Sequence, residues 1–234
     1  MRVSLATDPG TPGRANEDFA AAAPGVAVLL DGATTFPLGA DTGCVHGVAW
    51  YARALGAALL AAITTEPRVP IATRLAAAIG EVRDRHAGSC DLAHPATPAA
   101  TVTAVRAEPG RLSYLALSDS AIAADYGDRR PPLVITDTHE PAKASPDAAL
   151  RARTGTLAMD GLRGVALLSD GATRIADTFG MLDWPAVLSL ISGSGPDALI
   201  TQVRQAEAGD PGGIRWPRCK ASDDATVLWW RLAS

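Results

Sequence analysis

Acidic residues gather in four short clusters that are far apart in the sequence. The clusters are Asn16-Glu17-Asp18, Asp31-Gly32, Ser169-Asp170-Gly171 and Ser222-Asp223-Asp224. A carboxylate at the end of a buried strand is unfavourable unless a group of opposite charge lies beside it. Four such clusters suggest one shared partner, and hard divalent cations are the partners that several carboxylates bind best. The sequence therefore predicts a metal site.

Short apolar runs adjoin three of these clusters and have the composition of buried strands. These runs are residues 26–30, 164–168 and 225–232. Turn residues between other apolar runs predict further strands. These are expected at 2–7, in a hairpin over 19–30, and at 101–105, 111–117 and 121–125. Each predicted strand beside an acidic cluster would hold its carboxylate at the edge of a sheet.

Apolar residues recur at helical spacing in two consecutive segments, 42–63 and 71–86. Further helices are expected at 184–191 and 197–208, and a short one at 148–153 within an otherwise irregular segment, 137–163. Consecutive helices between blocks of strands favour a layered α+β domain over a repeating βαβ fold. With no evident linker or internal repeat, a single domain over residues 1–234 is expected.

The composition argues against binding to nucleic acid or insertion into a membrane. Hydrophobic residues make up 47% of the chain and the formal net charge is −4, without the basic stripe of a nucleic-acid binder. The most apolar stretch, 48–63, contains Arg53 and is shorter than the ~20 residues that a membrane span needs. The first residues do not resemble a signal peptide.

The spacing of the cysteines and histidines matches no disulfide framework and indicates no catalytic role. The cysteines are far apart: Cys44, Cys90 and Cys219. An odd number without a CxxC pair predicts no disulfide framework, and a reducing cytoplasm is the simplest location. The histidines occur in unrelated sequence contexts, where surface or structural roles are favoured: His46, His86, His94 and His139.

The ordered set of motifs resembles the metal-dependent protein phosphatases of type 2C, the PPM family. Five segments carry the resemblance: Arg14-Ala15-Asn16-Glu17-Asp18-Phe19, Leu29-Leu30-Asp31-Gly32, Leu117-Ser118-Asp119-Ser120, Leu168-Ser169-Asp170-Gly171 and Ser222-Asp223-Asp224-Ala225-Thr226-Val227. Their order and rough separation match over nearly the whole chain. The resemblance implies a four-layer αββα sandwich, with helices flanking two antiparallel sheets.

The resemblance also implies a binuclear Mg²⁺ or Mn²⁺ centre, with a weaker third metal, that activates water to hydrolyse phosphate esters. The implied ligands are Glu17, Asp31, the carbonyl of Gly32, Asp170 and Asp223, with Asp119 at the third site. Asp31 would bridge the two metals and, with Asp170, would be catalytic. Asp18 and Asp224 would orient the ligands, and Arg14 would hold the substrate phosphate, a task that suits the guanidinium fork.

The chain departs from the family pattern at several positions. Ser118 and Ala121 stand where the family has Gly and Arg, and Arg14 lies one residue closer than usual to the Glu-Asp pair. Arg174 stands where the family often has an acidic or amide residue for the third metal, so it would repel that metal or replace its charge. The segment between 136 and 164 is short for the loop that selects substrate.

The resemblance favours a serine/threonine protein phosphatase that acts on phosphoproteins. Two alternatives stay open: a phosphatase of small phosphate esters, and a catalytically weak member that serves as a binding or regulatory module. A third is an α+β domain whose acidic turns are only turns, because Asp-Gly is among the commonest turn dipeptides. No oligomeric state and no general acid are predicted.

Overall fold

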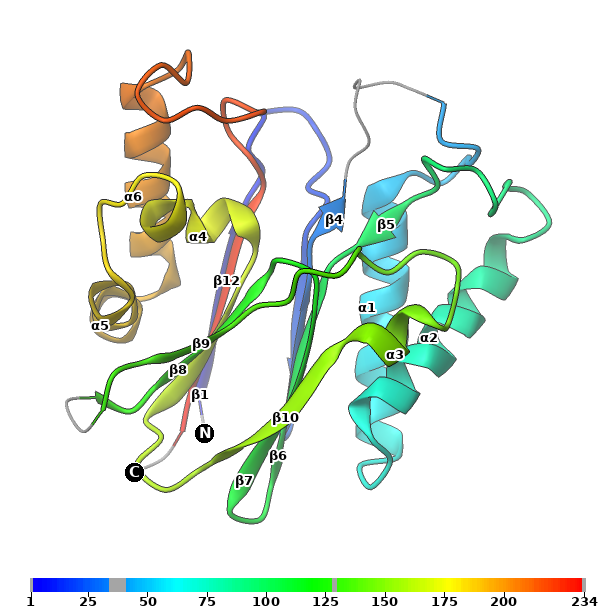
Figure 1. The fold of residues 1–234 in the computed structure, drawn as a ribbon, viewed down its shortest axis with the longest axis horizontal. Coiled ribbons are helices and arrows are strands. Elements are labelled where there is room, and N and C mark those ends of the chain that lie inside the picture. The colour runs from blue at the N-terminus through cyan, green and yellow to red at the C-terminus, as the bar shows by residue number, and fades with distance from the viewer. Residues whose placement is uncertain (1, 34–40, 128–129, 233–234) are drawn as a thin grey trace.

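Two antiparallel sheets lie face to face in the middle of the molecule (Figure 1). The computed structural model describes residues 2–33, 41–127 and 130–232. The first sheet has the strand order β1 (Arg2–Asp8), β12 (Ala225–Arg231), β11 (Gly164–Leu168), β8 (Ala121–Asp125) and β9 (Leu133–Ile135). The second has the order β10 (Arg153–Ala158), β7 (Arg111–Leu117), β6 (Val102–Glu108), β3 (Val26–Leu30) and β2 (Phe19–Ala23). A small sheet pairs β4 (Gly32–Ala33) with β5 (Ala99–Ala100).

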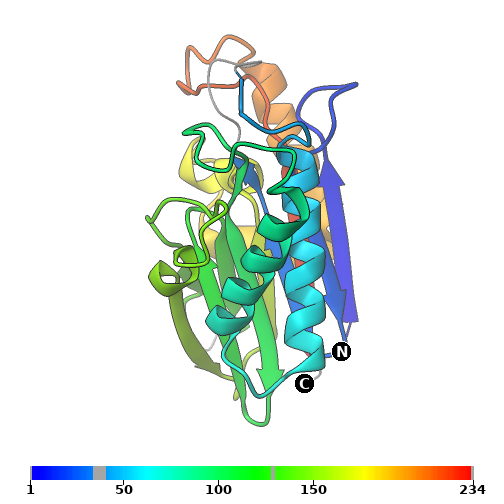
Figure 2. The ribbon, with the colours of Figure 1, turned by 90° about the vertical axis from the view of Figure 1, so that its right-hand side faces the viewer.

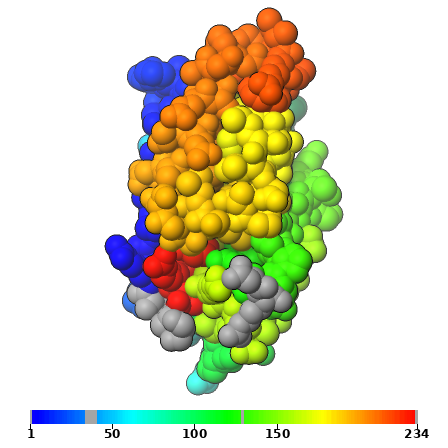
Figure 3. Space-filling model, turned by 90° about the vertical axis from the view of Figure 1, so that its left-hand side faces the viewer, coloured from blue at the N-terminus to red at the C-terminus, as the bar shows by residue number. Residues whose placement is uncertain are grey.

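Helices cover the outer face of each large sheet. The second sheet carries α1 (Val48–Thr65) and α2 (Ile71–His86), seen side by side in Figure 2, and α3 (Ala148–Arg151) packs on α2. The first sheet carries α4 (Asp170–Asp177), α5 (Trp184–Ser194) and α6 (Pro196–Gly209), which form the yellow and orange face in Figure 3. The layers are thus helix, sheet, sheet and helix, which confirms the predicted αββα sandwich.

Buried apolar side chains form three layers, one between each pair of neighbouring structural layers. In β3, Val28 faces α1 and α2 whereas Leu29 faces the other sheet. In β11, Leu168 faces the helices of its own side whereas Leu167 faces the other sheet. Because both faces of these strands are buried, apolar residues occur without the alternation that a half-exposed strand shows.

The helix α1 belongs to the core layer that lies on the second sheet. This helix is long enough and apolar enough to cross a membrane, judged by its length and composition alone. Its residues Leu55, Leu59 and Ile63 are fully buried in the same cluster as β3 and α2, and the Tyr51 hydroxyl donates to the carbonyl of Lys143 at 2.6 Å. Burial in this layer accounts for its apolar sequence.

Most predicted elements are present, and the exceptions have local reasons. The helix predicted from residue 42 begins at Val48, because Gly43 and Gly47 have φ of 65° and 76°, outside the helical region. The segment predicted as irregular contains α3 but also β10, an edge strand that exposes most of its side chains and so lacks an apolar signal. The short helix α4 and the strand β9 were not predicted.

Candidate active site

Three of the four acidic clusters meet where β3 and β11 end and β12 begins, in the upper part of Figure 1. Asp31 follows β3, Asp170 opens α4 directly after β11, and Asp223 precedes β12. The backbone amide of Asp170 donates to Oδ2 of Asp31 at 3.3 Å. This hydrogen bond joins the end of β11 in the first sheet to the end of β3 in the second. All three residues line a cleft of about 620 Å³. The cleft also contains Gly32 and Asp119.

Asp31 lies at the centre of the negative charge. Burial raises its pKa well above the ordinary value, and the charges of Asp18, Asp170 and Asp223 add to the shift. Burial likewise raises the pKa of Asp170, with the charge of Asp223 as the next cause. Carboxylates this close to one another favour either protonation or a bound cation.

Asp18 is buried below this group, and neither of its carboxylate oxygens has a hydrogen-bond partner among the described residues. Burial raises its pKa to about 7, while the nearby hydroxyls of Thr226 and Ser169 oppose the shift. Each hydroxyl also makes a further contact: Thr226 Oγ1 bonds to Thr7 Oγ1 at 2.7 Å, and Ser169 Oγ accepts from the amide of Thr226 at 2.8 Å. Two unpartnered buried oxygens are a site for a cation or its water ligands.

The fourth cluster, with Glu17, is tied to the other three by Asp224. Its Oδ2 accepts from the amide of Glu17 at 2.6 Å, and its Oδ1 accepts from the amide of Gly10 at 2.9 Å. Both oxygens therefore hold the loop that carries Glu17. Asp224 thereby supports the backbone of this loop.

The glycines of the two Asp-Gly pairs are required by close packing rather than by a turn. Neither Gly32 nor Gly171 has a positive φ, and Gly171 lies in the first turn of α4. A Cβ on Gly171 would lie 2.1 Å from the carbonyl oxygen of Asp224. A Cβ on Gly32 would lie 2.8 Å from the carbonyl oxygen of Glu17. These glycines therefore allow the acidic segments to approach one another closely.

Two basic side chains contact Asp223 from opposite directions. Arg174 Nη2 donates to Oδ2 at 2.9 Å, and Lys220 Nζ donates to Oδ1 at 2.7 Å. Each carboxylate oxygen can accept more than one interaction, so a cation can still bind there. Arg174 thereby brings a positive charge to one of the predicted metal ligands.

A buried ion-pair network fixes Arg174. Its Nη1 pairs with Oε1 of Glu207 at 3.0 Å, and Glu207 Oε2 pairs with Nη1 of Arg204 at 2.7 Å. Arg204 also donates to the carbonyl of Asp223 at 2.8 Å and pairs with Asp8 at 2.6 Å. The helix α6 thereby holds both the side chain and the backbone of Asp223.

Asp119 lies in the cleft after an unusual residue. Ser118 has a φ of 71°, which lies in the left-handed region that glycine favours. The amide of Ser118 donates to Asp137 Oδ2 at 3.2 Å, and the amide of Asp137 donates back to the Ser118 carbonyl at 2.9 Å. Asp119 itself is exposed, and its charge raises the pKa of Asp170, after burial and the charge of Asp223.

Arg14 lies beside the cleft and not within it. It is exposed and borders a smaller hollow with Glu17, Lys220 and Asp223. Its backbone amide donates to the carbonyl of Thr11 at 3.2 Å, within the loop that precedes β2.

Three further polar residues, Thr101, Ser120 and Lys220, were not predicted to belong to this region. Thr101 Oγ1 accepts from the amide of Asp31 at 3.2 Å and bonds to Ser120 Oγ at 2.6 Å. The amide of Thr101 donates to the carbonyl of Asp31 at 2.8 Å. With Lys220 on Asp223, these residues fix the backbone and the charge around two of the carboxylates. A single Thr between two strands and a single Lys in a loop carry no sequence signal for such roles.

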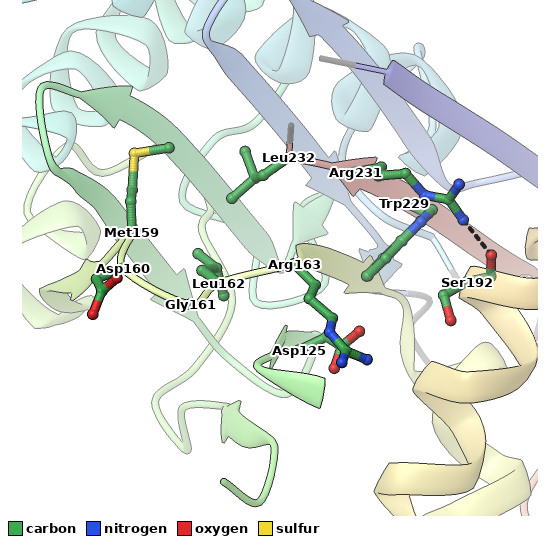
Figure 4. A pocket seen from close by; sticks show the side chains of 10 residues that line it. All are labelled: Asp125, Met159, Asp160, Gly161, Leu162, Arg163, Ser192, Trp229, Arg231 and Leu232. Atoms are coloured by element: carbon green, nitrogen blue, oxygen red, sulfur yellow. Dashed lines mark hydrogen bonds between the residues drawn. The ribbon is translucent and has the colours of Figure 1, made fainter. Parts of the chain in front are cut away.

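A second hollow, of about 660 Å³, lies at the opposite end of the first sheet (Figure 4). Figure 4 shows Arg163 beside Asp125, whose carbonyl accepts from the Arg163 amide at 2.8 Å, and Arg231 donating to the Ser192 carbonyl. None of the predicted site residues lines it. Two acidic and two basic side chains line this hollow, so it does not gather carboxylates as the acidic cleft does. The acidic cleft therefore remains the candidate active site.

The donor set of the cleft fits hard divalent cations. Carboxylate oxygens are the ligands that Mg²⁺ and Mn²⁺ prefer. The unpartnered oxygens of Asp18 and the raised pKa of Asp31 both show negative charge that the described residues leave incompletely compensated. A cation beside Asp31 would relieve both.

Comparison with known proteins identifies a family for this sequence. Protein phosphatase 2C is the family that matches the chain, over residues 13–193. A search of curated proteins gave no match.

Several solved structures share the fold. The phosphatase Stp1 from Staphylococcus aureus has a TM-score of 0.68 at 13% identity, over 99% of this chain and 95% of that one. The PPM Ser-Thr phosphatase MsPP from Mycobacterium smegmatis, in complex with cacodylate, has a TM-score of 0.66 at 18% identity, over 100% and 99%. The catalytic domain of PstP, in complex with two manganese ions, has a TM-score of 0.64 at 13% identity, over 100% and 98%. Because the family match spans most of the sequence, this chain belongs to the protein phosphatase 2C family.

Proposed function

We propose that the chain is a serine/threonine protein phosphatase that hydrolyses phosphate esters with the help of two divalent cations, Mg²⁺ or Mn²⁺. The observation that carries the proposal is the convergence of Asp31, Asp170 and Asp223, from three separate strand ends, on one cleft. Membership of the family supports a phosphoprotein as the substrate. The manganese in the PstP structure supports the choice of cation.

In this proposal the residues of the cleft hold the cations. Asp31 would be a ligand of both ions, Asp170 and Asp223 would complete the site of one, and Glu17 and the Gly32 carbonyl would serve the other. When bound, such a pair of ions would lower the pKa of a shared water and stabilise the attacking and leaving oxygens of the phosphoryl group. No nucleophilic side chain is then needed.

The remaining polar groups position these ligands. Asp224 holds the backbone of Glu17, and Thr101 holds the backbone of Asp31. Arg14, exposed beside Glu17 and Asp223, would bind the phosphate oxygens of the substrate through its guanidinium fork. The exposed Asp119 would contribute to a weaker third cation site.

Hydrolysis of para-nitrophenyl phosphate with Mn²⁺, with Mg²⁺ or with EDTA tests the chemistry. We expect activity that requires metal and is lost in Asp170→Asn. Asp160→Asn is a matched control, because Asp160 lies at the far hollow, and it should retain full activity. Activity in EDTA, or full activity in Asp170→Asn, would refute the two-cation proposal.

A substrate panel then tests the protein-phosphatase part. Phosphoserine and phosphothreonine peptides should be hydrolysed with a higher kcat/KM than sugar phosphates or nucleotides of equal concentration. The reverse preference would favour the small-molecule alternative while keeping the metal chemistry.

One observation favours a catalytically weak member that acts as a binding module. Both oxygens of Asp223 are already paired with basic residues of the chain, Arg174 and Lys220. If these pairs exclude the cation, the folded protein would show no hydrolysis with any metal but would still bind phosphopeptides. Binding and turnover measured on the same peptides separate the two functions.

A further inference from the structure

Four side chains with soft donor atoms converge outside the acidic cleft. Cys44 and His46 lie in the segment that leads into α1, His86 is the last residue of α2, and Cys90 follows four residues later. Their ligand atoms all lie within 4.8 Å of one another. We call these four residues the thiol–imidazole cluster. The fold thus brings together His46 and His86, which occur in unrelated sequence contexts.

The distances within the cluster are close to those of a tetrahedral metal site. Cys44 Sγ lies 3.8 Å from His46 Nδ1 and 3.7 Å from His86 Nδ1, and Cys90 Sγ lies 3.3 Å from His46 Nδ1. Tetrahedral zinc, with Zn–S of about 2.3 Å and Zn–N of about 2.0–2.1 Å, separates its ligand atoms by about 3.4–3.8 Å. The two sulfurs lie 3.0 Å apart, so they would separate by less than about 1 Å around an ion.

The surrounding structure holds the donors in place. The amide of Asp91 donates to the carbonyl of Gly43 at 2.7 Å, which joins the segment before α1 to the segment after α2. The ring of Trp50 stacks on His46 with a centroid distance of 4.2 Å. His86 is only 1% exposed. Donors fixed in this way lose little freedom when they bind an ion.

The chemistry of the donors selects the ion. Two thiols and two imidazoles form the Cys₂His₂ set of structural zinc sites, whereas Mg²⁺ and Mn²⁺ prefer the oxygens of the acidic cleft. Four protein ligands leave no open coordination position, which is typical of a structural site. The signal is also present in sequence, as Cys44-x-His46 and His86-x₃-Cys90, but these pairs are 40 residues apart and match no common zinc motif.

We propose that the thiol–imidazole cluster binds one structural Zn²⁺, which fastens the segment before α1 to the end of α2. The site is separate from the acidic cleft, and the proposal does not rest on the proposed function. Val48, the first residue of α1, packs against Gly32, where an added Cβ would lie 2.5 Å from Val48 Cγ1. Zinc would therefore also steady the wall of the cleft that carries Gly32.

Metal content and cobalt substitution test the proposal on the whole chain. The protein is purified with a thiol reductant, dialysed against excess Mg²⁺ to fill the acidic cleft, and assayed for zinc. We expect one equivalent of zinc in the wild type. After exchange with Co²⁺, we expect the absorption of tetrahedral cobalt with a thiolate-to-cobalt charge-transfer band, which carboxylate ligands do not produce.

Variants assign the ligands. Cys44→Ser and Cys90→Ser should lose the zinc and the charge-transfer band, while Cys219→Ser, the exposed third thiol, should keep both. His94→Gln, a histidine outside the cluster, should also keep both. Loss of zinc should lower the Tm, since metal bound only to the folded state stabilises it.

The wild-type readouts alone can overturn the proposal, even if a variant fails to fold. Absence of bound zinc, or bound Co²⁺ without a thiolate band, would exclude the zinc site. A Cys44–Cys90 disulfide found in protein purified without reductant, with no zinc taken up after reduction, would identify a redox pair instead. Zinc that persists in Cys90→Ser would place the ion elsewhere.

Discussion

Arg174 donates to Asp223 across 2.9 Å, so a basic side chain of the chain itself contacts a carboxylate that the family resemblance assigns to a metal. Arg174 is held there by Glu207, whose side chain is 2% exposed. The pair lies at the wall of the cleft where the family often has a further acidic or amide residue. The two ion pairs thus hold the guanidinium of Arg174 beside the acidic cleft.

Removal of Arg174 should affect stability and metal binding in opposite directions. Arg174→Ala leaves Glu207 with Arg204 as its ion-pair partner. We therefore expect the free energy of unfolding to fall by about 3 kcal/mol. The same change removes a positive charge from Asp223, so we expect affinity for Mn²⁺ to rise by about tenfold, or ~1.4 kcal/mol. Chemical denaturation and calorimetric titration measure the two effects.

Arg174→Lys is the matched control for this prediction. It keeps the charge but loses the two-pronged contact, so affinity for Mn²⁺ should stay near that of the wild type while stability falls. Weaker metal binding in Arg174→Ala would show that the arginine orients Asp223 for the metal rather than competing with it.

The protein without Mg²⁺ or Mn²⁺ should become less stable as the pH rises. The pKa of Asp18 is raised to about 7 and those of Asp31 and Asp170 are also raised, so the folded state binds these protons more tightly than the unfolded chain. Stability from a raised carboxylate pKa is present at low pH and lost as the pH passes through the folded value. Thermal melts between about pH 5 and about pH 8 should show a falling Tm.

Two comparisons test the cause of this pH dependence. Asp18→Asn should flatten it, and saturating Mn²⁺ should reduce it, because a cation replaces the proton as the partner of the carboxylates. The pKa values of Glu108 and Asp210 are lowered to about 2. These two carboxylates therefore change their protonation below the pH range of the melts. A Tm that rises with pH over this range would contradict the prediction. It would mean that the pKa values of these carboxylates are not raised in the folded state.

Ser118→Gly should stabilise the fold. A non-glycine residue at φ of 71° costs about 1–2 kcal/mol, part of which the greater freedom of glycine in the unfolded chain offsets. We expect a net gain of about 0.5–1 kcal/mol in urea denaturation. Ser118→Ala keeps the strained backbone and should bring no such gain; equal gains in both variants would assign the effect to the hydroxyl instead.

Gly171→Ala should disturb the acidic cleft. Its Cβ would lie 2.1 Å from the carbonyl oxygen of Asp224, so α4 or the segment before β12 must shift. We expect a loss of about 2–3 kcal/mol in stability and weaker binding of Mn²⁺. Gly80→Ala is the control: it lies within α2 with no atom within 4 Å of the added Cβ, and it should stabilise by about 1 kcal/mol. Unchanged affinity for Mn²⁺ in Gly171→Ala would show that metal binding does not depend on the close approach of Gly171 to Asp224.

The sequence by itself determined the layers of the fold and the ends of the strands that carry the acidic residues. Buried strands such as β3 and β11 appear as continuous apolar runs because both faces are covered, and each run ends close to the residue that enters the cleft, Asp31 or Asp170. The helix α2 has the bounds that its periodicity predicts. These features depend on neighbours along the chain, which a sequence displays directly.

Only the tertiary structure decided which distant groups meet. The pairing of Arg174 with Asp223, and the approach of Cys44 to His86, depend on how helices pack against sheets and on loops whose paths have no periodic signal. The edge strand β10 was missed for the same reason, since its pairing with β7 and not its own composition makes it a strand. Contacts between residues far apart in sequence follow from the packing of the whole chain, so they are fixed only when the layers assemble.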